Sequence, residues 1–324
     1  MVLTDVTARD GLQALKTVLP THRKLALVED LIAAGCRRIE VASFVNQKMV
    51  PTMADADELC ARLPRHEGVQ YGGVVLDVRG MERLMTAELD WAGVAVAASD
   101  TFLMRNQRCD TAGALDRVAD IERMRRGTRT RISGYVSCCF ACPYEGHMNS
   151  TRVAELCDAL LELGVDDVYL ADTTGRGTPP ATRRLLQETL GRIPVERMGC
   201  HFHDTHGQAI ANLDAALLAG VRKIDAAAAG LGGCMFAPGA TGNVASEDVL
   251  TLLSAHGVDA GIDIGQLAKI GQSLCEELKV PNETGLPVSG STPRSTILDP
   301  STTRVRHRIM DAIMNPSLGS DCVH

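Results

Sequence analysis

Short apolar runs alternate with amphipathic stretches over about the first 256 residues of the chain. The runs are apolar at successive positions, which is typical of parallel strands buried on both faces. In the stretches between them, apolar residues recur every three or four positions, the spacing of a helix with one buried face. The predicted strands are Val2–Val6, Arg38–Ala42, Gln70–Leu76, Trp91–Ala97, Ile132–Cys138, Asp167–Ala171, Met198–Phe202 and Lys223–Ala228. The predicted helices are Thr21–Ala34, Thr52–Leu63, Gly80–Glu88, Thr111–Met124, Ser150–Leu163, Pro180–Arg192, Gln208–Leu218 and Ser246–His256.

The first predicted helix shows how its ends are encoded. Leu25, Val28 and Leu31 fall on one face of it. Thr21 is a residue type that caps helix N-termini, and Gly35 suits the position after the last turn. We therefore expect Thr21 to cap this helix.

Eight strand and helix pairs predict an α/β protein with a closed (β/α)8 TIM barrel rather than two open sheets. A length of 324 residues allows either arrangement. We expect residues 1–257 to form the catalytic barrel. Residues 258–324 then form a C-terminal extension, with one more helical pattern at Ile264–Leu278 and an irregular remainder, that packs on the barrel or on a partner subunit.

Composition narrows the class of protein further. Hydrophobic residues make up 45% of the chain but aromatic residues only 3%, so small aliphatic side chains must fill the core. A net charge of −7 disfavours a nucleic-acid partner. No apolar run approaches the ~20 residues that span a bilayer, so no membrane partner is expected.

The cysteines indicate a reducing compartment. Their number, 11, is odd and their spacing forms no disulfide framework. Because the chain shows no signal or transit peptide, we expect a cytoplasmic protein. Cys138, Cys139 and Cys142 lie close together but lack a second pair to complete a metal knuckle, so we expect buried thiols.

Arginines recur between Arg123 and Arg131. This segment joins a predicted helix to the next strand and therefore lies at the amino-terminal face of the barrel. Reacting groups of such barrels lie at the opposite face. The run is accordingly expected to be solvated surface rather than a binding site.

Polar residues follow the predicted strands at their carboxyl ends, where a barrel of this type carries its chemistry. The first strand leads to Arg9 and Asp10, the second contains Glu40 and the sixth ends at Asp172, while the loop after the eighth ends at Asn243. A charged residue among apolar neighbours is costly unless it is paired or bound to a metal. We therefore expect these polar side chains to lie together at one rim of the barrel.

His201 and His203 are the sharpest local signal. They stand two residues apart on a strand, so both rings point to the same side. A pair of hydrogen-bonded core histidines is the alternative, but Asp10 and Asn243 on the same rim favour a metal site. Nitrogen and oxygen donors without thiolate indicate Mg²⁺ or Mn²⁺.

The glycine-rich loop over residues 229–243 permits close approach of backbone to a ligand and predicts a lid. It follows the last strand rather than the first, so it is not a dinucleotide fingerprint, and no nucleotide redox cofactor is expected. Cys234 stands near its centre. This thiol is either a small apolar residue or a group for proton transfer.

Six segments together resemble 3-hydroxy-3-methylglutaryl-CoA lyase, one of the metal-dependent barrel lyases and synthases with an Arg-Asp pair after the first strand. The segments are DVTARDGLQ (5–13), IEVASFV (39–45), SGYVSCCFACPYEG (133–146), YLADTTGRGTP (169–179), GCHFHDTHGQAIAN (199–212) and AGLGGCMFAPGATGN (229–243). The resemblance implies an acyl-CoA substrate, cleaved to acetyl-CoA and acetoacetate, and a homodimer or higher homo-oligomer.

Matched position by position, the resemblance implies a role for each residue. The metal ligands would be Asp10, His201, His203 and Asn243. Arg9 would neutralise the thioester oxygen, Cys234 would be a general acid or base, and Glu40 and Asp172 would orient Arg9 or relay protons. The pocket residues would be Gln13, Ser43, Tyr135 and Thr173.

Departures from the family pattern gather around the pocket and the lid. Ala8 replaces a proline, Met49 a tryptophan and Ser133 an arginine, and Met235 and Phe236 replace Pro-Tyr. They leave open another branched 3-hydroxyacyl-CoA, such as citramalyl-CoA, as the substrate. An inactive barrel that serves as a binding protein is a further alternative.

Overall fold

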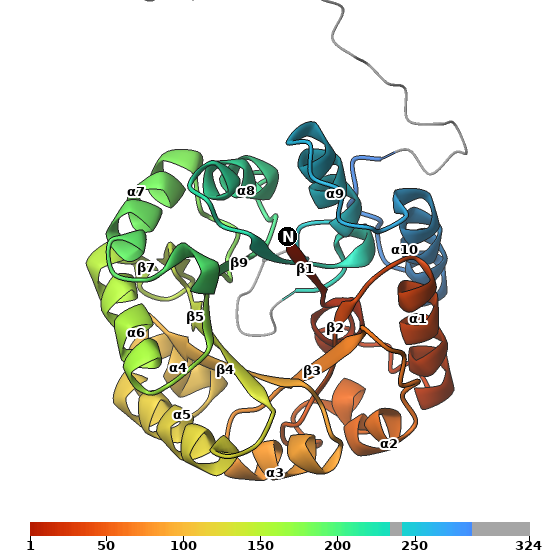
Figure 1. The fold of residues 1–324 in the computed structure, drawn as a ribbon, viewed down its shortest axis with the longest axis horizontal. Coiled ribbons are helices and arrows are strands. Elements are labelled where there is room, and N and C mark those ends of the chain that lie inside the picture. The colour runs from red at the N-terminus through yellow and green to blue at the C-terminus, as the bar shows by residue number, and fades with distance from the viewer. Residues whose placement is uncertain (234–241, 287–324) are drawn as a thin grey trace, which may run out of the picture. The chain divides into compact units, whose positions relative to one another are not determined.

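A computed structural model describes residues 1–233 and 242–286. In this part of the chain eight parallel strands close into a barrel, in the order β1-β10-β9-β8-β5-β4-β3-β2. Figure 1 shows the strands inside a ring of helices, as the alternating pattern predicts. The barrel strands are β1 (Val2–Asp5), β2 (Arg38–Ser43), β3 (Gln70–Val74), β4 (Trp91–Ala97), β5 (Arg131–Ser137), β8 (Asp167–Asp172), β9 (Met198–Phe202) and β10 (Lys223–Ala226).

The outer helices follow the predicted order. They are α1 (Thr21–Ala33), α2 (Ala56–Ala61), α3 (Val78–Thr86), α4 (Asp100–Asn106), α5 (Thr111–Arg125), α6 (Ser150–Glu162), α7 (Pro179–Leu190), α8 (Ala209–Leu218), α9 (Ser246–Ala255) and α10 (Ile264–Leu278). Short helical turns lie at η1 (Thr7–Gly11), η2 (Pro51–Met53), η3 (Val195–Arg197) and η4 (Ala228–Gly230). The α/β barrel prediction is confirmed, and α10 has the bounds expected from the sequence.

Two local predictions were wrong. The helix expected over 52–63 is divided into η2 and α2, because buried Lys24 donates to the Thr52 carbonyl and pairs with Asp55 at the break. Thr21 does not cap α1, since its hydroxyl donates to Asp55 instead (2.9 Å) and Pro20 is the N-cap residue.

Two small elements carry no clear periodic signal and were not predicted. Helix α4 begins after Ser99, whose hydroxyl accepts a hydrogen bond from the Phe102 amide (3.0 Å). A short antiparallel pair follows β5, made of β6 (Ala141–Cys142) and β7 (Gly146–His147). Both elements lie in connections that follow barrel strands at their carboxyl ends, where TIM barrels carry their insertions.

Small residues let the few large side chains enter the barrel core. A Cβ atom added at Gly72 would lie 1.9 Å from Trp91 Cε2, within the space the indole ring occupies. Trp91 is fully buried, and the Arg38 guanidinium lies 4.2 Å from the centre of its ring. Glycine at this position of β3 is therefore required by close packing on β4.

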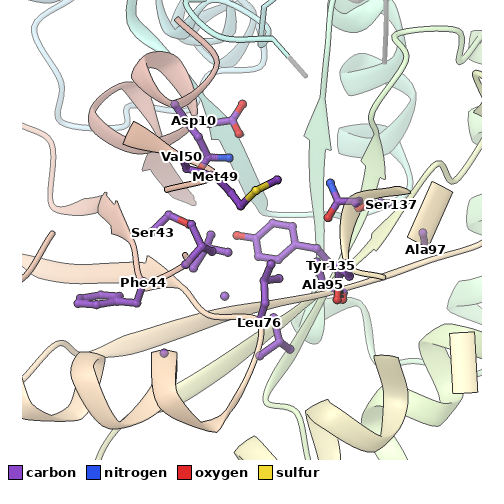
Figure 2. A pocket seen from close by; sticks show the side chains of 18 of the residues that line it. Asp10, Ser43, Phe44, Met49, Val50, Leu76, Ala95, Ala97, Tyr135 and Ser137 are labelled. Atoms are coloured by element: carbon purple, nitrogen blue, oxygen red, sulfur yellow. Dashed lines mark hydrogen bonds between the residues drawn. The ribbon is translucent and has the colours of Figure 1, made fainter. Parts of the chain in front are cut away.

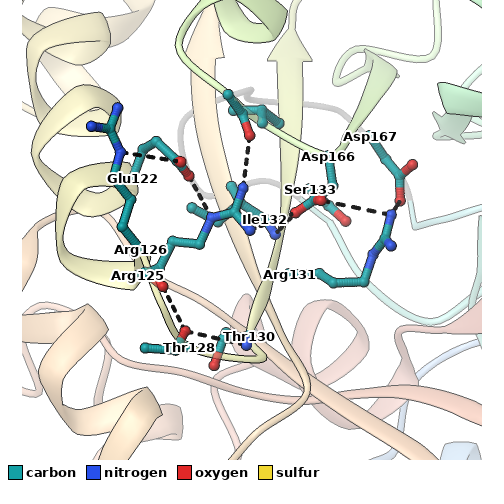
Figure 3. A network of polar contacts seen from close by, with 12 residues as sticks. Glu122, Arg125, Arg126, Thr128, Thr130, Arg131, Ile132, Ser133, Asp166 and Asp167 are labelled. Atoms are coloured by element: carbon teal, nitrogen blue, oxygen red, sulfur yellow. Dashed lines mark hydrogen bonds and ion pairs between the residues drawn. The ribbon is translucent and has the colours of Figure 1, made fainter.

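The arginine run at the end of α5 is largely neutralised by carboxylates (Figure 3). Arg125 pairs with Glu122 and also donates to the Gly164 carbonyl (2.8 Å), while Arg131 lies 3.5 Å from Asp167. These contacts tie α5 and β5 to the start of β8. The segment joins helix to strand as expected and acts as a structural ion-pair network.

No disulfide joins the cysteines in the described part of the chain, and those at 138, 139 and 142 are buried, as predicted. None of the helices in the described ranges combines the length and apolarity needed to cross a bilayer.

Candidate active site and metal centre

Three buried side chains from two parts of the barrel converge at its carboxyl-terminal rim. Strand β9 carries His201 and leads directly to His203, while η1, immediately after β1, carries Asp10. One ligand atom from each residue lies within 4.8 Å of the others. The alternation of side chains along β9 turns both imidazoles the same way, toward the carboxylate. This arrangement can hold a divalent cation.

Asn243 joins this group through the backbone and the side chain. The backbone of Asn243 forms an antiparallel bridge with His203. The side-chain amide nitrogen of Asn243 donates to Asp10 Oδ2 (2.7 Å) and to the Leu231 carbonyl (2.9 Å). The amide oxygen is buried and has no hydrogen-bond partner within the described ranges. A buried acceptor without a donor is costly, and a cation beside it would remove that cost.

The backbone of the glycine-rich loop approaches these side chains closely. Gly232 has a φ of +134°, and a Cβ atom there would lie 2.4 Å from the Asn243 amide nitrogen and 3.3 Å from Asp10 Oδ2. Only glycine fits this backbone conformation and this space. At Gly232 the glycine-rich loop thus brings its backbone against two proposed cation ligands.

Charges at the rim keep the Asp10 carboxyl ionised. Burial raises its pKa, but the Arg9 guanidinium and the two imidazoles outweigh burial and lower the pKa to about 2. A carboxylate with two imidazoles and an amide oxygen is a donor set of oxygen and nitrogen without thiolate. Such a set fits a hard or borderline divalent ion.

Arg9 is held by two carboxylates. Its Nε atom pairs with Glu40 on β2 and its Nη1 atom pairs with Asp10. Burial lowers the pKa of the guanidinium, but the two carboxylates outweigh it and raise the pKa above the ordinary value. Arg9 therefore stays charged and keeps a fixed direction beside the cation site.

Asp225 is a further candidate site residue, and the sequence analysis did not identify it. It lies on β10, fully buried, and its Oδ2 atom is 3.3 Å from His201 Nδ1 and 3.0 Å from the Tyr135 hydroxyl, which donates to it. Metal-binding histidines commonly have such a carboxylate behind them. An acidic residue inside an apolar strand, the signal that singled out Glu40, is present in β10 too and could have identified it.

Asp172 does not contact Arg9. Its carboxylate accepts hydrogen bonds from the backbone amides of Gly177 (2.7 Å) and Arg176 (3.2 Å) after β8. Burial raises the pKa of Asp172 and the hydrogen bonds from these amides lower it; burial outweighs them, and the pKa is about 6. Thr173, next in sequence, accepts a hydrogen bond from the Cys138 amide (3.0 Å). In this structure Asp172 orders the turn beside the cavity.

A cavity of about 1000 Å³ opens over the rim. Arg9, Asp10, His201 and His203 line it together with the four predicted pocket residues, which are Gln13, Ser43, Tyr135 and Thr173. Figure 2 shows Asp10, Ser43 and Tyr135 at its wall. Cys234 lies outside the described residues, whereas its neighbour Gly233 lines the cavity.

Sequence comparison agrees with this geometry. The HMGL-like family model matches residues 1–274. A Pseudomonas aeruginosa protein named 3-hydroxy-3-isohexenylglutaryl-CoA/hydroxymethylglutaryl-CoA lyase is 42% identical over 280 residues, which are 86% of this chain and 93% of that protein. The mitochondrial hydroxymethylglutaryl-CoA lyase of Gallus gallus is 36% identical over 276 residues, 85% of this chain and 93% of that protein.

Solved structures share the fold. The hydroxymethylglutaryl-CoA lyase of Pseudomonas aeruginosa superposes with a TM-score of 0.84 at 41% identity and covers 88% of this chain and 95% of its own. An HMG-CoA lyase of Acinetobacter baumannii, in complex with coenzyme A and 3-methylmalate, gives a TM-score of 0.86 at 34% identity, with 92% and 97% covered. The chain therefore belongs to the HMGL-like family of carbon–carbon lyases, which includes the 3-hydroxy-3-methylglutaryl-CoA lyases.

Proposed function

We propose that this protein is a divalent-metal-dependent 3-hydroxy-3-methylglutaryl-CoA lyase. The reaction breaks the C2–C3 bond of the substrate and yields acetyl-CoA and acetoacetate. One observation carries the proposal: the cluster Asp10, His201 and His203 lines the same cavity as Arg9. The reaction needs a cation site and a fixed positive charge close together.

The bond changes balance without an oxidant or reductant. The C3 hydroxyl loses its proton, and its oxygen becomes the carbonyl oxygen of acetoacetate. The electron pair of the C2–C3 bond moves to C2 and is delocalised onto the thioester oxygen as an enolate. A proton then adds at C2 and completes the acetyl group.

Asp10, His201, His203 and Asn243 would hold the cation. Bound there, it would polarise the C3 hydroxyl and lower the pKa of that hydroxyl. The donor set without thiolate favours Mg²⁺ or Mn²⁺ over zinc. The amide oxygen of Asn243, which has no hydrogen-bond partner among the described residues, supports its place among the ligands.

Arg9 stabilises the enolate. Its two carboxylate partners, Glu40 and Asp10, hold the guanidinium in place before the substrate arrives. A preorganised charge of this kind lowers the barrier because it need not reorient as negative charge develops on the thioester oxygen. Glu40 thus acts by positioning Arg9.

Cys234 supplies the proton at C2 as a general acid. Gly233 at the cavity wall supports this role, because it brings the chain to the cavity one residue before the thiol. Gln13, Ser43, Tyr135 and Thr173 contact the acyl and thioester groups. Asp172 contributes by ordering the backbone that follows β8 beside the cavity, and a proton-relay role for it stays a prediction.

The wider assignments follow from this function. The partner is an acyl-CoA, and we expect a homodimer or higher homo-oligomer in the cytoplasm. Residues 1–257 form the catalytic barrel and residues 258–324 the extension. Within the extension, the packing of α10 against α1 and α9 supports its attachment to the barrel.

A substrate panel tests the proposal. The purified protein, with Mg²⁺ or Mn²⁺, is given 3-hydroxy-3-methylglutaryl-CoA and citramalyl-CoA, and acetyl-CoA release is measured. We expect efficient cleavage of the glutaryl ester. Much faster cleavage of citramalyl-CoA would assign the other substrate. No cleavage of either ester would favour an inactive binding protein.

A further inference from the structure

Lys24 carries a buried charge outside the proposed reaction centre. It lies on α1 and is only 1% exposed. Its Nζ atom donates to the Thr52 carbonyl (2.5 Å) and pairs with the Asp55 carboxylate (2.5 Å). An ammonium group loses hydration when it is buried, so an apolar side chain of similar length would fill this position at a lower cost in free energy. What the ammonium adds to packing is a hold on the backbone at Thr52.

The backbone that Lys24 holds belongs to η2, a short turn whose Thr52 and Met53 are buried. Hydrogen bonds connect this turn to the chain before it. The Met53 amide donates to the Val50 carbonyl (3.1 Å), and the Val50 amide donates to the Asn46 carbonyl (3.1 Å). The position of η2 therefore determines where the preceding residues lie.

These preceding residues, 45–50, are called here the wall segment because they form part of the cavity wall. Its members that line the cavity are Val45, Asn46, Gln47, Met49 and Val50. Figure 2 shows Met49 and Val50 at the cavity. The register of β2 with β3 ends at Ser43, so the wall segment depends on attachments outside the sheet. The contact of η2 with Lys24 is such an attachment.

Thr52 connects the same turn to a second part of the cavity wall. Its hydroxyl donates to the Gln13 carbonyl (2.8 Å). Gln13 is one of the proposed pocket residues and lines the cavity. The side-chain oxygen of Gln13 is buried and has no hydrogen-bond partner among the described residues, an arrangement that costs free energy until a donor reaches it. Thr52 thus fixes the backbone that carries this acceptor.

We propose that Lys24, acting through Thr52, is a positioning residue for substrate binding. Its ammonium fixes η2, and η2 in turn fixes the wall segment and Gln13. Neither Lys24 nor Thr52 lines the cavity, so both act through other residues. This inference rests on the proposed function and extends it to residues remote from the chemistry. Because the wall contacts the substrate equally before and during bond cleavage, loss of the ammonium raises KM and leaves kcat unchanged.

The first test replaces the buried charge in the full-length, metal-loaded protein. Lys24→Met keeps a long side chain, and Asp55 retains the Thr21 hydroxyl as a donor. With 3-hydroxy-3-methylglutaryl-CoA we expect KM to rise about tenfold, kcat to stay within about twofold and Mn²⁺ affinity to be unchanged. Lys269→Met, on the exposed surface of α10, is the matched control and changes none of these values. An unchanged KM in Lys24→Met, or a fall in kcat alone, overturns only this inference. No cleavage by the unchanged protein removes the proposed function and the inference with it.

The second test leaves the ion pair intact and therefore protects the first against misfolding of Lys24→Met. Thr52→Val keeps the shape of the side chain and removes the hydroxyl, and we expect KM to rise about two- to tenfold, the range for one hydrogen bond. Thr52→Ser keeps a hydroxyl and restores the original KM. In the double variant Lys24→Met, Thr52→Val, KM rises by less than the product of the two separate rises, because both changes act on the same turn. Equal KM values in Thr52→Val and Thr52→Ser, or a fully multiplicative double variant, overturn the inference.

Discussion

The carboxylate of Asp225 stands behind His201, with its Oδ2 atom 3.3 Å from the imidazole Nδ1. This contact leaves the other ring nitrogen free to face Asp10 and His203. It favours the tautomer with the proton on Nδ1, because that proton can be donated to the carboxylate. The same oxygen accepts the hydroxyl of Tyr135, so the proposed cation site and the cavity wall are joined through one buried carboxylate.

Replacing this carboxylate should weaken metal binding. Asp225→Asn keeps the size of the side chain but removes the charge that orients His201. We expect a 10- to 100-fold loss of Mn²⁺ affinity, the usual effect of such a partner, measured by calorimetric titration of the metal-free protein. Asp30→Asn, on the exposed surface of α1, serves as the control. Equal Mn²⁺ affinity in Asp225→Asn and the unchanged protein would show that the contact does not support a metal ligand.

The Cys234 thiol should matter for turnover and not for the metal. In Cys234→Ala we expect unchanged Mn²⁺ affinity and a kcat lower by ~10²–10⁴-fold, because general acid–base catalysis has that magnitude. His201→Ala is the complementary variant and should lose both metal and turnover. Near-normal turnover of Cys234→Ala would assign the proton transfer to another group, and full metal content in His201→Ala would exclude the proposed site.

Packing between β3 and β4 predicts a strong effect at Gly72. In Gly72→Ala the new methyl group would overlap the Trp91 ring. Strands β3 and β4 are paired within the closed barrel, so they cannot move apart to relieve the overlap. We expect a loss of ~1–3 kcal/mol or more in the free energy of unfolding, measured by urea denaturation. Gly191→Ala is the matched control, since the φ of −67° at Gly191 suits alanine and the nearest neighbour of the added Cβ atom, the Gln187 carbonyl oxygen, lies 3.7 Å away. Similar stabilities of the two variants would contradict the packing argument.

Stability should fall as the pH rises because of Glu247. Burial raises the pKa of this residue on α9 to about 7, above its ordinary value near 4.5. Its carboxyl group accepts the Ala229 amide (3.0 Å) and faces Asp5, Asp248 and Cys275. The folded state binds the proton more tightly, so this contribution to stability is complete below about pH 4.5 and is lost as the pH rises through about 7.

Glu247→Gln removes this titration and keeps an oxygen acceptor for the Ala229 amide. Each unit of pKa difference corresponds to ~1.4 kcal/mol. The variant should therefore gain stability relative to the unchanged protein as the pH is raised from 5 to 8.5, as measured by urea denaturation across that range. A constant difference between the two proteins at all pH values would contradict the raised pKa.

The sequence determined the barrel and most of its rim. The alternation of apolar runs with stretches of helical periodicity is a local property of the sequence. The strands and α10 can therefore be predicted without knowing any long-range contact. The parallel arrangement then brings strand ends to one face, which is why Asp10, His201 and His203 were predicted together. Asn243 joined them because it ends the loop after the last strand.

Tertiary structure decided what depends on partners distant in the chain. Thr21 and Asp172 are residue types with several possible partners, and their hydrogen bonds go to Asp55 and to the backbone after β8 because folding brings those groups within reach. Asp225 acquires its role only when β10 lies beside β9. The place of Ala95 at the cavity could not be predicted from sequence either, since an alanine in a strand gives no sign of whether a neighbour fills the space in front of it. Local sequence patterns determine the helices and strands, whereas the cavity and the partners of each polar side chain are determined only when the barrel packs together.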